Sequence, residues 1–486
     1  MKKRISEMWK VVYWFVGIFG LFFPTLIVLK SDWIKTFFTL TFCLFVFWII
    51  VHFKEAKFPW KISEKSKTVV LVIWIMCFVS RLAIILFLND NMIQISDFGV
   101  ALQKTADLDF RADYYRVFSH WILYPLINHK LFVMFGENQI VPMIINSAIL
   151  SLIPVFLYLI GKRIASYVVG IVAALLYIIW PSTALYVTIY TPDHYAALLL
   201  TIAVYLVVIL FEMRGQINKK IVVITCLLGI VLSISSFFKN FASVFMFALF
   251  LMVCIMAIKY KDIQDSLKNV FSLVIIIVVF CVMKSMIFVG VDNLVGSTVG
   301  RNIAPCYLNV GLNSSGDGNY NPELYGEYFE LLEKTEYDFN KTNSNIINNL
   351  KEDIEENYRL LPDKLLQKAE RDFQGDREKL YWVKNSLDEK SDTMYSIWIE
   401  NKLYGITDIY WLFICIWMVF GILWMVLNKN DNTLYIVLCL IGTAIELVLV
   451  EAQGRYRYAM EPLFCLMAAV GIYYGVQKVK EYARVH

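Results

Sequence analysis

The chain has 486 residues, of which 59% are hydrophobic and only 18% are charged, and its mean hydropathy is +0.59. A soluble domain is nearer half apolar and a quarter charged, so this balance predicts a polytopic membrane protein. The net charge is only +4 and there is no dense basic run, which argues against nucleic acid as a partner.

Long apolar runs follow one another along most of the chain. A helix needs roughly 20 apolar residues to cross a bilayer. The runs predict an all-α membrane protein with about twelve transmembrane helices. They lie near residues 11–29, 33–52, 68–88, 139–160, 164–180, 192–211, 221–238, 241–258, 270–290, 407–427, 433–450 and 459–476. The first run follows the charged start Met1-Lys2-Lys3-Arg4 without an apparent cleavage site, so we expect it to remain as a span.

Lysine and arginine residues gather in alternate loops between these spans. Such loops include Lys162-Arg163 and Lys219-Lys220, and both ends of the chain are also basic. Because cytoplasmic loops carry an excess of Lys and Arg, the alternation predicts a multi-pass plasma membrane protein with both termini in the cytoplasm. The segments 89–138, 181–191, 291–403 and 451–458 then share the extracytoplasmic face.

Two of these outer segments are long enough to form structure of their own. Residues 89–138 form an outer loop within a predicted transmembrane core of residues 1–290. Residues 291–403 begin rich in glycine and mix charged and apolar residues at helical spacing from about Pro322 onward. They predict a mostly helical extracytoplasmic domain. Residues 404–486 are expected to hold the last three transmembrane helices and an outer turn rich in arginine and tyrosine.

Asp97 is the candidate catalytic residue in the first outer loop. It follows Ser96 and precedes a segment, Val100 to Ala106, that is typical of a helix. One interpretation is an N-cap, in which a short acceptor side chain satisfies free backbone N–H groups. The other is a general base. The two are compatible, because a carboxylate at a helix start is held in a fixed direction.

The outer turn near the end of the chain carries Arg455, Tyr456 and Arg457. The positive-inside rule disfavours two arginines on an outer face. An anionic ligand would account for them, since an arginine fork matches phosphate geometry. The alternative is interfacial anchoring, with tyrosines in the aromatic belt and arginines at lipid headgroups.

Further ionisable residues stand at or within the spans. Asp193 and His194 follow Pro192 at the outer start of a span, and they form either a ligand site or a polar rim. Arg81, Lys239 and Lys284 are expected to face protein, water or a counter-charge, or to snorkel to headgroups. Lys239 is the strongest candidate for a phosphate contact among them, whereas Arg81 suits a structural pair equally well.

Several short strings, in this order and on one predicted side, resemble the GT-C fold glycosyltransferases, in the branch of the protein mannosyltransferases and aminoarabinose transferases. They are Ser80-Arg81-Leu82, Ser96-Asp97-Phe98, Tyr124-Pro125-Leu126, Trp180-Pro181-Ser182, and Arg455-Tyr456-Arg457-Tyr458 with Glu461-Pro462. The resemblance covers residues of about 68–290 and 405–480. It implies a GT-C-like fold and an inverting transfer of a sugar from a polyprenyl-phosphate carrier to an acceptor hydroxyl on the outer face.

In that chemistry Asp97 would take the proton of the acceptor hydroxyl as the oxygen attacks the anomeric carbon. Arg455 or Arg457, with Lys239, would stabilise the departing lipid phosphate. Asp193 and His194 would orient the sugar or the acceptor. The implied partners are the lipid-linked donor, the bilayer and an acceptor that is a wall polymer, a glycolipid or a protein. No cofactor is certain, and a divalent metal remains open.

The chain also departs from that family. Many relatives have two adjacent acidic residues where this chain has Asp97-Phe98, and their outer domain follows the last span. Two rival functions stay open: a flippase or transporter of lipid-linked sugars, and a polysaccharide polymerase or ligase. Transporters often show related halves, and this sequence has no evident internal symmetry.

Overall fold

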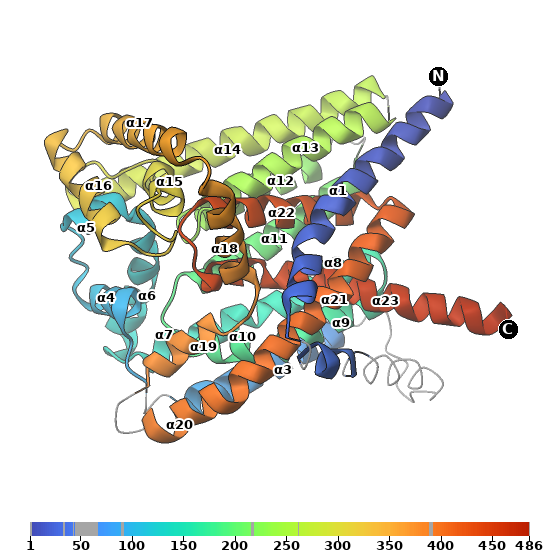
Figure 1. The fold of residues 1–486 in the computed structure, drawn as a ribbon, viewed down its shortest axis with the longest axis horizontal. Helices are drawn as coiled ribbons and strands as arrows, with labels where there is room; N and C mark the ends of the chain where they lie inside the picture. Colours follow the sequence, from blue (N-terminus) through green and yellow to red (C-terminus); the bar gives the residue numbers. More distant parts are fainter. Residues whose placement is uncertain are drawn as a thin grey trace.

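The computed structural model describes residues 2–32, 35–41, 43, 67–88, 92–214, 218–260, 262–387 and 392–485. Within these ranges the regular structure is helical, and β pairing is limited to one isolated bridge between Met92 and Leu387. The two chain ends lie on one side of the molecule, and α4, α5, α16 and α17 lie on the opposite side (Figure 1).

Nine helical segments of the described chain are long and apolar enough to cross a membrane. They are Val11–Lys30 in α1, Lys67–Leu88 (α3), Ile140–Ile164 (α7 and α8), Asp193–Glu212 (α11), Ala242–Tyr260 (α13), Ile263–Val295 (α14), Tyr395–Asn428 (through α21), Asp431–Leu449 (α22) and Gly454–Tyr482 (through α23). The chain is therefore an all-α polytopic membrane protein, as its composition predicts.

The other three predicted spans differ from these nine. The run at 164–180 forms α9 (Tyr167–Ile178), which joins α10 (Pro181–Leu185) and the turn to Thr188 at a bend of 62°. The run at 221–238 forms α12 (Lys219–Ser235), which has 17 residues. Most of the run at 33–52 lies outside the described residues. Nine spans, or ten with the bent pair, are thus supported, and a count of twelve stays a prediction.

The bend after α9 has a local cause. Proline cannot donate a backbone hydrogen bond, and it restricts the preceding residue to extended conformations. Trp180 accordingly has φ −66° and ψ 112°, and Pro181 begins a new helix at its first position. The broken span thereby turns α10 toward the predicted outer domain, where it contacts α19 (Glu378–Asn385).

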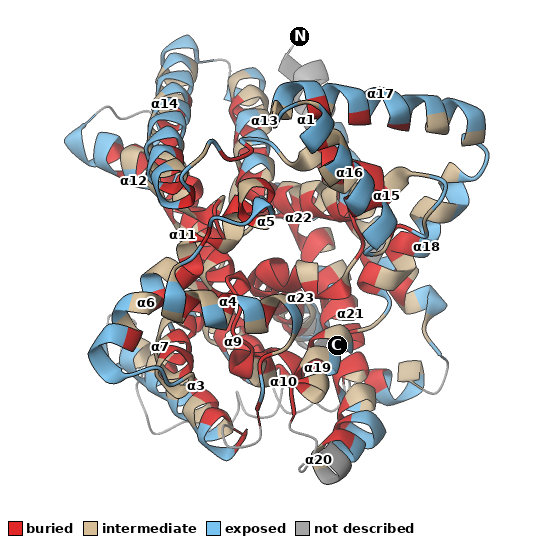
Figure 2. Cartoon of the chain, turned by 90° about the vertical axis from the view of Figure 1, so that its left-hand side faces the viewer, coloured by how far each residue is buried: buried red, intermediate tan, exposed pale blue. Residues whose placement is uncertain are grey.

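The centre of the bundle is formed by α11, α21, α22 and α23, whose residues are mostly buried, whereas α14 and α17 are widely exposed (Figure 2). Helices α21 (Tyr404–Asn428) and α23 (Glu461–Val485) cross closely at two glycines. A Cβ atom on Gly471 would stand 1.8 Å from the Trp417 carbonyl oxygen, and one on Gly421 would stand 2.1 Å from that of Met467. Small residues at this crossing let the two backbones approach.

The predicted outer loop and outer domain pack together at one end of the bundle (Figure 1). The loop forms α4 (Ser96–Asp107), α5 (Asp113–Val117), a 3-10 turn (Ser119–Trp121) and α6 (Leu123–Phe135). The domain forms α15 (Ala304–Leu312), α16 (Pro322–Lys334), α17 (Phe339–Asn357), α18 (Leu361–Phe373), α19 (Glu378–Asn385) and α20 (Asp392–Trp398). Val117 and Phe118 of the loop share an apolar cluster with Cys306, Leu324 and Tyr328 of the domain.

Candidate active site

Asp97 lies in the first turn of α4, with its side chain 42% exposed. The N-cap of this helix is Ile95, so the N-cap interpretation of Ser96-Asp97 is not what the structure shows. The Tyr114 hydroxyl donates to Asp97 Oδ1 at 3.5 Å, and Arg455 Nη2 stands 3.9 Å from Oδ2. The two contacts orient the carboxylate. Because both are long, the carboxylate remains accessible to a further hydrogen-bond donor.

Burial, followed by the negative charge of Asp97, raises the pKa of the Tyr114 phenol. The phenol therefore stays protonated at neutral pH and remains a donor to Asp97. This tyrosine was not singled out from the sequence, because Asp113-Tyr114-Tyr115 is an ordinary polar and aromatic string.

Arg455 presents a buried cation to Asp97. Its side chain is only 6% exposed, and its Nε donates to Gln453 Oε1 at 2.7 Å. The guanidinium lies 4.9 Å from the ring centroid of Phe98 and 4.6 Å from that of Trp382. These aromatic faces attract the cation and exclude water from it. The charge is thus held in one place, with its Nη2 end toward the carboxylate.

Lys239 lies in the turn between α12 and α13. Its Nζ stands 3.5 Å from Asp193 Oδ1 and 3.6 Å from the centroid of the Tyr456 ring. Burial lowers the pKa of Lys239, and the neighbouring Asp193 partly opposes that effect. Asp193, at the start of α11, therefore neutralises a cation in this structure.

The Tyr456 ring connects the two cations. Lys239 Nζ and the Arg455 guanidinium both lie within cation–π range of it, at 3.6 and 5.6 Å from the centroid. The Tyr456 hydroxyl donates to Glu451 Oε1 at 3.1 Å, and Glu451 also accepts from Tyr325 of the outer domain. Residues far apart in sequence thus form one cluster, which we call the Asp97 cluster: Asp97, Tyr114, His120, Asp193, Lys239, Arg455 and Tyr456.

His120 belongs to this cluster although no sequence motif marks it. It lies in the 3-10 turn Ser119–Trp121 and is half-buried. Burial and then the charge of Lys239 lower its pKa to about 3, while Asp193 acts in the opposite direction. A lone histidine beside Trp121 is often only a packed side chain, which is why the sequence gives no signal here.

His120 is expected to make the protein less stable in mild acid. Its pKa is about 3 in the folded chain, against about 6.5 in the unfolded chain, so between about pH 6.5 and pH 3 it is mainly the unfolded histidine that takes up a proton. Stability should fall by about 2 kcal/mol between pH 7.5 and pH 5 through this group. Thermal unfolding of wild type and His120→Gln at both pH values measures it. The variant should lose less stability on acidification, and His129→Gln, which removes a histidine outside the cluster, is the control.

His194 lies behind the cluster and is fully buried. Its Nε2 stands 3.1 Å from the Ile189 carbonyl oxygen, and its Nδ1 stands 3.0 Å from the Tyr458 hydroxyl. A carbonyl only accepts, so Nε2 is the donor and Nδ1 accepts from the tyrosine. Both ring nitrogens are hydrogen bonded, so His194 holds the start of α11 in place.

Arg457 and Arg81 also lie in the interior. Arg457 Nη1 donates to the Asp372 carbonyl oxygen at 2.6 Å, and its Nη2 pairs with Asp376 Oδ1 at 2.8 Å. Arg81 Nη1 donates to the Thr183 carbonyl oxygen at 3.1 Å, and its guanidinium lies over the Tyr177 ring. Of the two arginines in the predicted phosphate turn, only Arg455 faces Asp97.

A buried ionic network lies next to Arg457. Lys379 Nζ stands 3.1 Å from Asp376 Oδ1 and forms a second ion pair with Glu461, and each of these side chains is at most 2% exposed. Asp376 also accepts from Trp180 Nε1 at 2.6 Å and from Thr407 at 3.0 Å. The network joins the outer domain to α10, α21 and α23. The sequence gives no signal for it, because Lys379 and Glu461 are 82 residues apart, Trp180 and Asp376 are 196 apart, and all stand in unremarkable strings.

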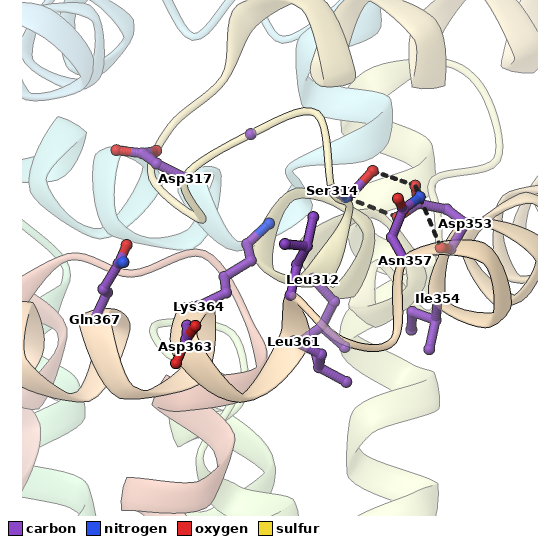
Figure 3. Close-up of a pocket in the computed structure, with 12 residues that line it drawn as sticks. Leu312, Ser314, Asp317, Asp353, Ile354, Asn357, Leu361, Asp363, Lys364 and Gln367 are labelled. Atoms are coloured by element: carbon purple, nitrogen blue, oxygen red, sulfur yellow. Dashed lines mark hydrogen bonds between the residues drawn. The ribbon is translucent and has the colours of Figure 1, made fainter.

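A separate cavity of about 420 Å³ lies within the outer domain, between the loop at 312–317 and helices α17 and α18 (Figure 3). Asp353 and Ser314 hydrogen bond at one side of it, and Lys364 extends toward it from α18. None of the predicted site residues lines this cavity. Asp353 also accepts from Asn357, and Lys364 donates to the Asn313 carbonyl oxygen.

Metal-binding geometry is also missing from the part of the chain that the structure describes. No group of three or more His, Cys, Asp or Glu side chains there could hold a metal ion. Asp97 and Asp193 instead stand beside Arg455 and Lys239, respectively.

No protein-family model matches the sequence, and no curated protein matches it. The function therefore has to be argued from the Asp97 cluster.

Proposed function

We propose that the chain is an inverting GT-C-type glycosyltransferase that moves a sugar from a polyprenyl-phosphate carrier to an acceptor hydroxyl. The observation that carries the proposal is the meeting of the accessible carboxylate of Asp97, the buried cation of Arg455 and the partly buried cation of Lys239 around Tyr456. They lie at one end of a bundle of membrane-spanning helices, where a lipid-linked phosphate is within reach of protein side chains.

The reaction is a single displacement at the anomeric carbon. The acceptor oxygen forms a bond to that carbon while its proton passes to an Asp97 carboxylate oxygen. The bond between the anomeric carbon and the phosphate oxygen breaks, and its electron pair stays on the polyprenyl phosphate. Attack from the face opposite the phosphate inverts the configuration.

Arg455 and Lys239 would stabilise the phosphate as its charge increases. Both are largely shielded from water, so their attraction for an anion is stronger than at an exposed surface. A phosphate next to Lys239 adds a negative charge that raises its lowered pKa again. Arg457 and His194 are held by internal bonds, and Arg81 donates from Nη1 to the Thr183 carbonyl oxygen. In this mechanism the three residues position the elements that carry the reacting groups.

The proposal also assigns the site to one side of the membrane. Helix α4, which carries Asp97, lies at the end of the molecule opposite the chain termini (Figure 1). Lys and Arg in alternate loops favour a cytoplasmic side for the termini, so the site would be extracytoplasmic in the plasma membrane.

A donor screen tests the function. Membranes from cells that express the chain, and matched membranes that lack it, receive radiolabelled polyprenyl-phosphate sugars, and the label that leaves the lipid is followed. Transfer of single sugars only where the chain is present is the expected result, and it also identifies the sugar. Movement of labelled lipid across the bilayer without release would instead favour a flippase, and transfer of whole glycans would favour a polymerase or ligase.

Lys239→Gln is expected to lower kcat/KM for the lipid-linked donor by about 10- to 100-fold, because a hydrogen bond to a charged group contributes about 1.5–3 kcal/mol. Steady-state kinetics with the donor found in the screen measures it. Lys284→Gln is the matched control, since Lys284 lies in α14 beside Phe280 and Phe288 and is not a member of the Asp97 cluster. Equal losses of kcat/KM in the two variants would contradict a role of Lys239 in the proposed phosphate site.

A further inference from the structure

Two adjoining cavities lie at the end of the bundle opposite Asp97. The first, the terminal cavity, has about 320 Å³ and is lined by the ends of α11, α13, α21 and α22, including Glu212, Arg214, Tyr260, Lys429 and Asp431. The second, the apolar groove, has about 40 Å³ and is lined by Leu249 and Val253 of α13 and by Lys268, Leu273 and Ile276 of α14. Phe211, Arg214 and Met256 line both, so the polar cavity continues into the apolar one.

The charges along these cavities are arranged to receive an anion. Asp431 accepts from Lys259 Nζ at 2.7 Å and from Tyr260 at 2.6 Å, and Glu212 pairs with Arg163. The nearest cation to each lining carboxylate, Lys259 or Arg163, thus lies outside the set that lines the cavities, and the lining Lys268 pairs with Asp265 at 3.5 Å. Arg214 stacks on the Tyr260 ring at 3.8 Å and stands 4.0 Å from Asp431, and it shares the lining with Lys268 and Lys429.

The apolar groove runs along part of the depth of one membrane leaflet. Its lining on α13 extends from Met256 to Leu249. At a rise of 1.5 Å per residue this stretch is about 10 Å long, against about 15 Å for half of a hydrocarbon core of about 30 Å. The terminal cavity stands at the ends of the apolar helices, where lipid headgroups lie.

We propose that the terminal cavity and the apolar groove together bind one anionic glycerophospholipid of the surrounding leaflet. Its phosphate lies between Arg214, Lys268 and Lys429, and the first methylene groups of one acyl chain enter the groove beside Val253 and Leu273. A polar, cationic cavity at headgroup level that opens into a small apolar groove matches the headgroup and the start of an acyl chain of such a lipid. The site is independent of Asp97 and of any transfer reaction.

Lipid binding to the purified full chain in detergent tests the site, with dioleoyl-phosphatidylglycerol and dioleoyl-phosphatidylcholine as probes and native mass spectrometry as the readout. Wild type is expected to prefer the anionic lipid. Arg214→Gln with Lys268→Gln should weaken binding of the anionic lipid by about 30-fold, and Lys429→Gln alone by about 5-fold, because each cation at a membrane surface contributes about 1 kcal/mol. Binding of phosphatidylcholine should change little in these variants.

The apolar groove is tested by Val253→Trp, which should weaken both lipids. A double variant of two exposed lysines in the outer domain, Lys334→Gln with Lys351→Gln, matches the charge change and should bind like wild type. Circular dichroism establishes that each variant is folded. Equal binding of the two lipids by wild type, or equal loss in both double variants, would overturn the proposal. Displacement by glycerol 3-phosphate as effective as by the lipid would do so too, because it would show a site for free phosphate.

Discussion

An Asp97→Asn variant is expected to lose transfer activity by about 10²- to 10⁴-fold, the usual contribution of a general base. The amide is nearly isosteric but cannot accept the acceptor proton. Its loose contacts with Tyr114 and Arg455, at 3.5 and 3.9 Å, should leave the fold and the donor affinity largely unchanged. The measurement compares wild type and variant at equal expression, following both donor binding and release of labelled sugar.

Asp109→Asn is the matched control for this experiment. Asp109 belongs to the same outer loop and is exposed, where it pairs with Arg111 at 2.9 Å. Its loss should leave transfer within about two-fold of wild type, since exposed ion pairs contribute little. Full transfer by Asp97→Asn would leave Asp97 as a residue of the first helical turn and refute its role as the base.

Lys379→Met is expected to lower the free energy of unfolding by about 3–5 kcal/mol, because it leaves Asp376 and Glu461 buried with fewer counter-charges. The effect should appear first as detachment of the outer domain, since Asp376 and Lys379 belong to it and Glu461 to α23. Thermal unfolding in detergent, followed by tryptophan fluorescence, measures the loss. Trp180, which donates to Asp376, is a suitable reporter.

Arg371→Gln provides the contrast for Lys379→Met. Arg371 pairs with Asp317 at the surface of the same domain, so its removal should cost less than about 1 kcal/mol. A double variant, Lys379→Met with Glu461→Gln, should be less destabilised than the sum of the two single variants, because the two side chains form one pair. Strict additivity, or a loss of stability no larger than that of Arg371→Gln, would contradict the assigned role of the network.

The membrane-spanning helices could be predicted from the sequence because their signal is local. Each of the nine segments that can cross a membrane overlaps an apolar run seen in the sequence. Two other runs show where such counting fails. The run at 164–180 is bent by Trp180-Pro181, and α12 ends at Ser235, ahead of the turn that carries Lys239. Hydropathy measures composition over a window, and it does not report where the backbone turns.

For the charged residues of the candidate site, the sequence likewise predicts one part and leaves another part undetermined. The sequence shows that Asp97, Lys239 and Arg455 are unusual, because they are charged residues next to apolar spans. It does not show that they lie together around Tyr456, because the contacts join segments hundreds of residues apart. His120 and Tyr114 become recognisable only once their neighbours in space are known.

Arg455 and Arg457 show most directly what the sequence does not determine. They are identical in type, two residues apart, and equally plausible as phosphate contacts in the sequence. In the 3-10 segment Gly454–Met460, with three residues per turn, neighbours two apart leave the helix in different directions. One guanidinium therefore faces Asp97 and the other is buried against Asp376. Residue type and hydropathy, which are local, were determined by the sequence alone; the partner of each charge was decided by tertiary packing, because burial and distance set its energy.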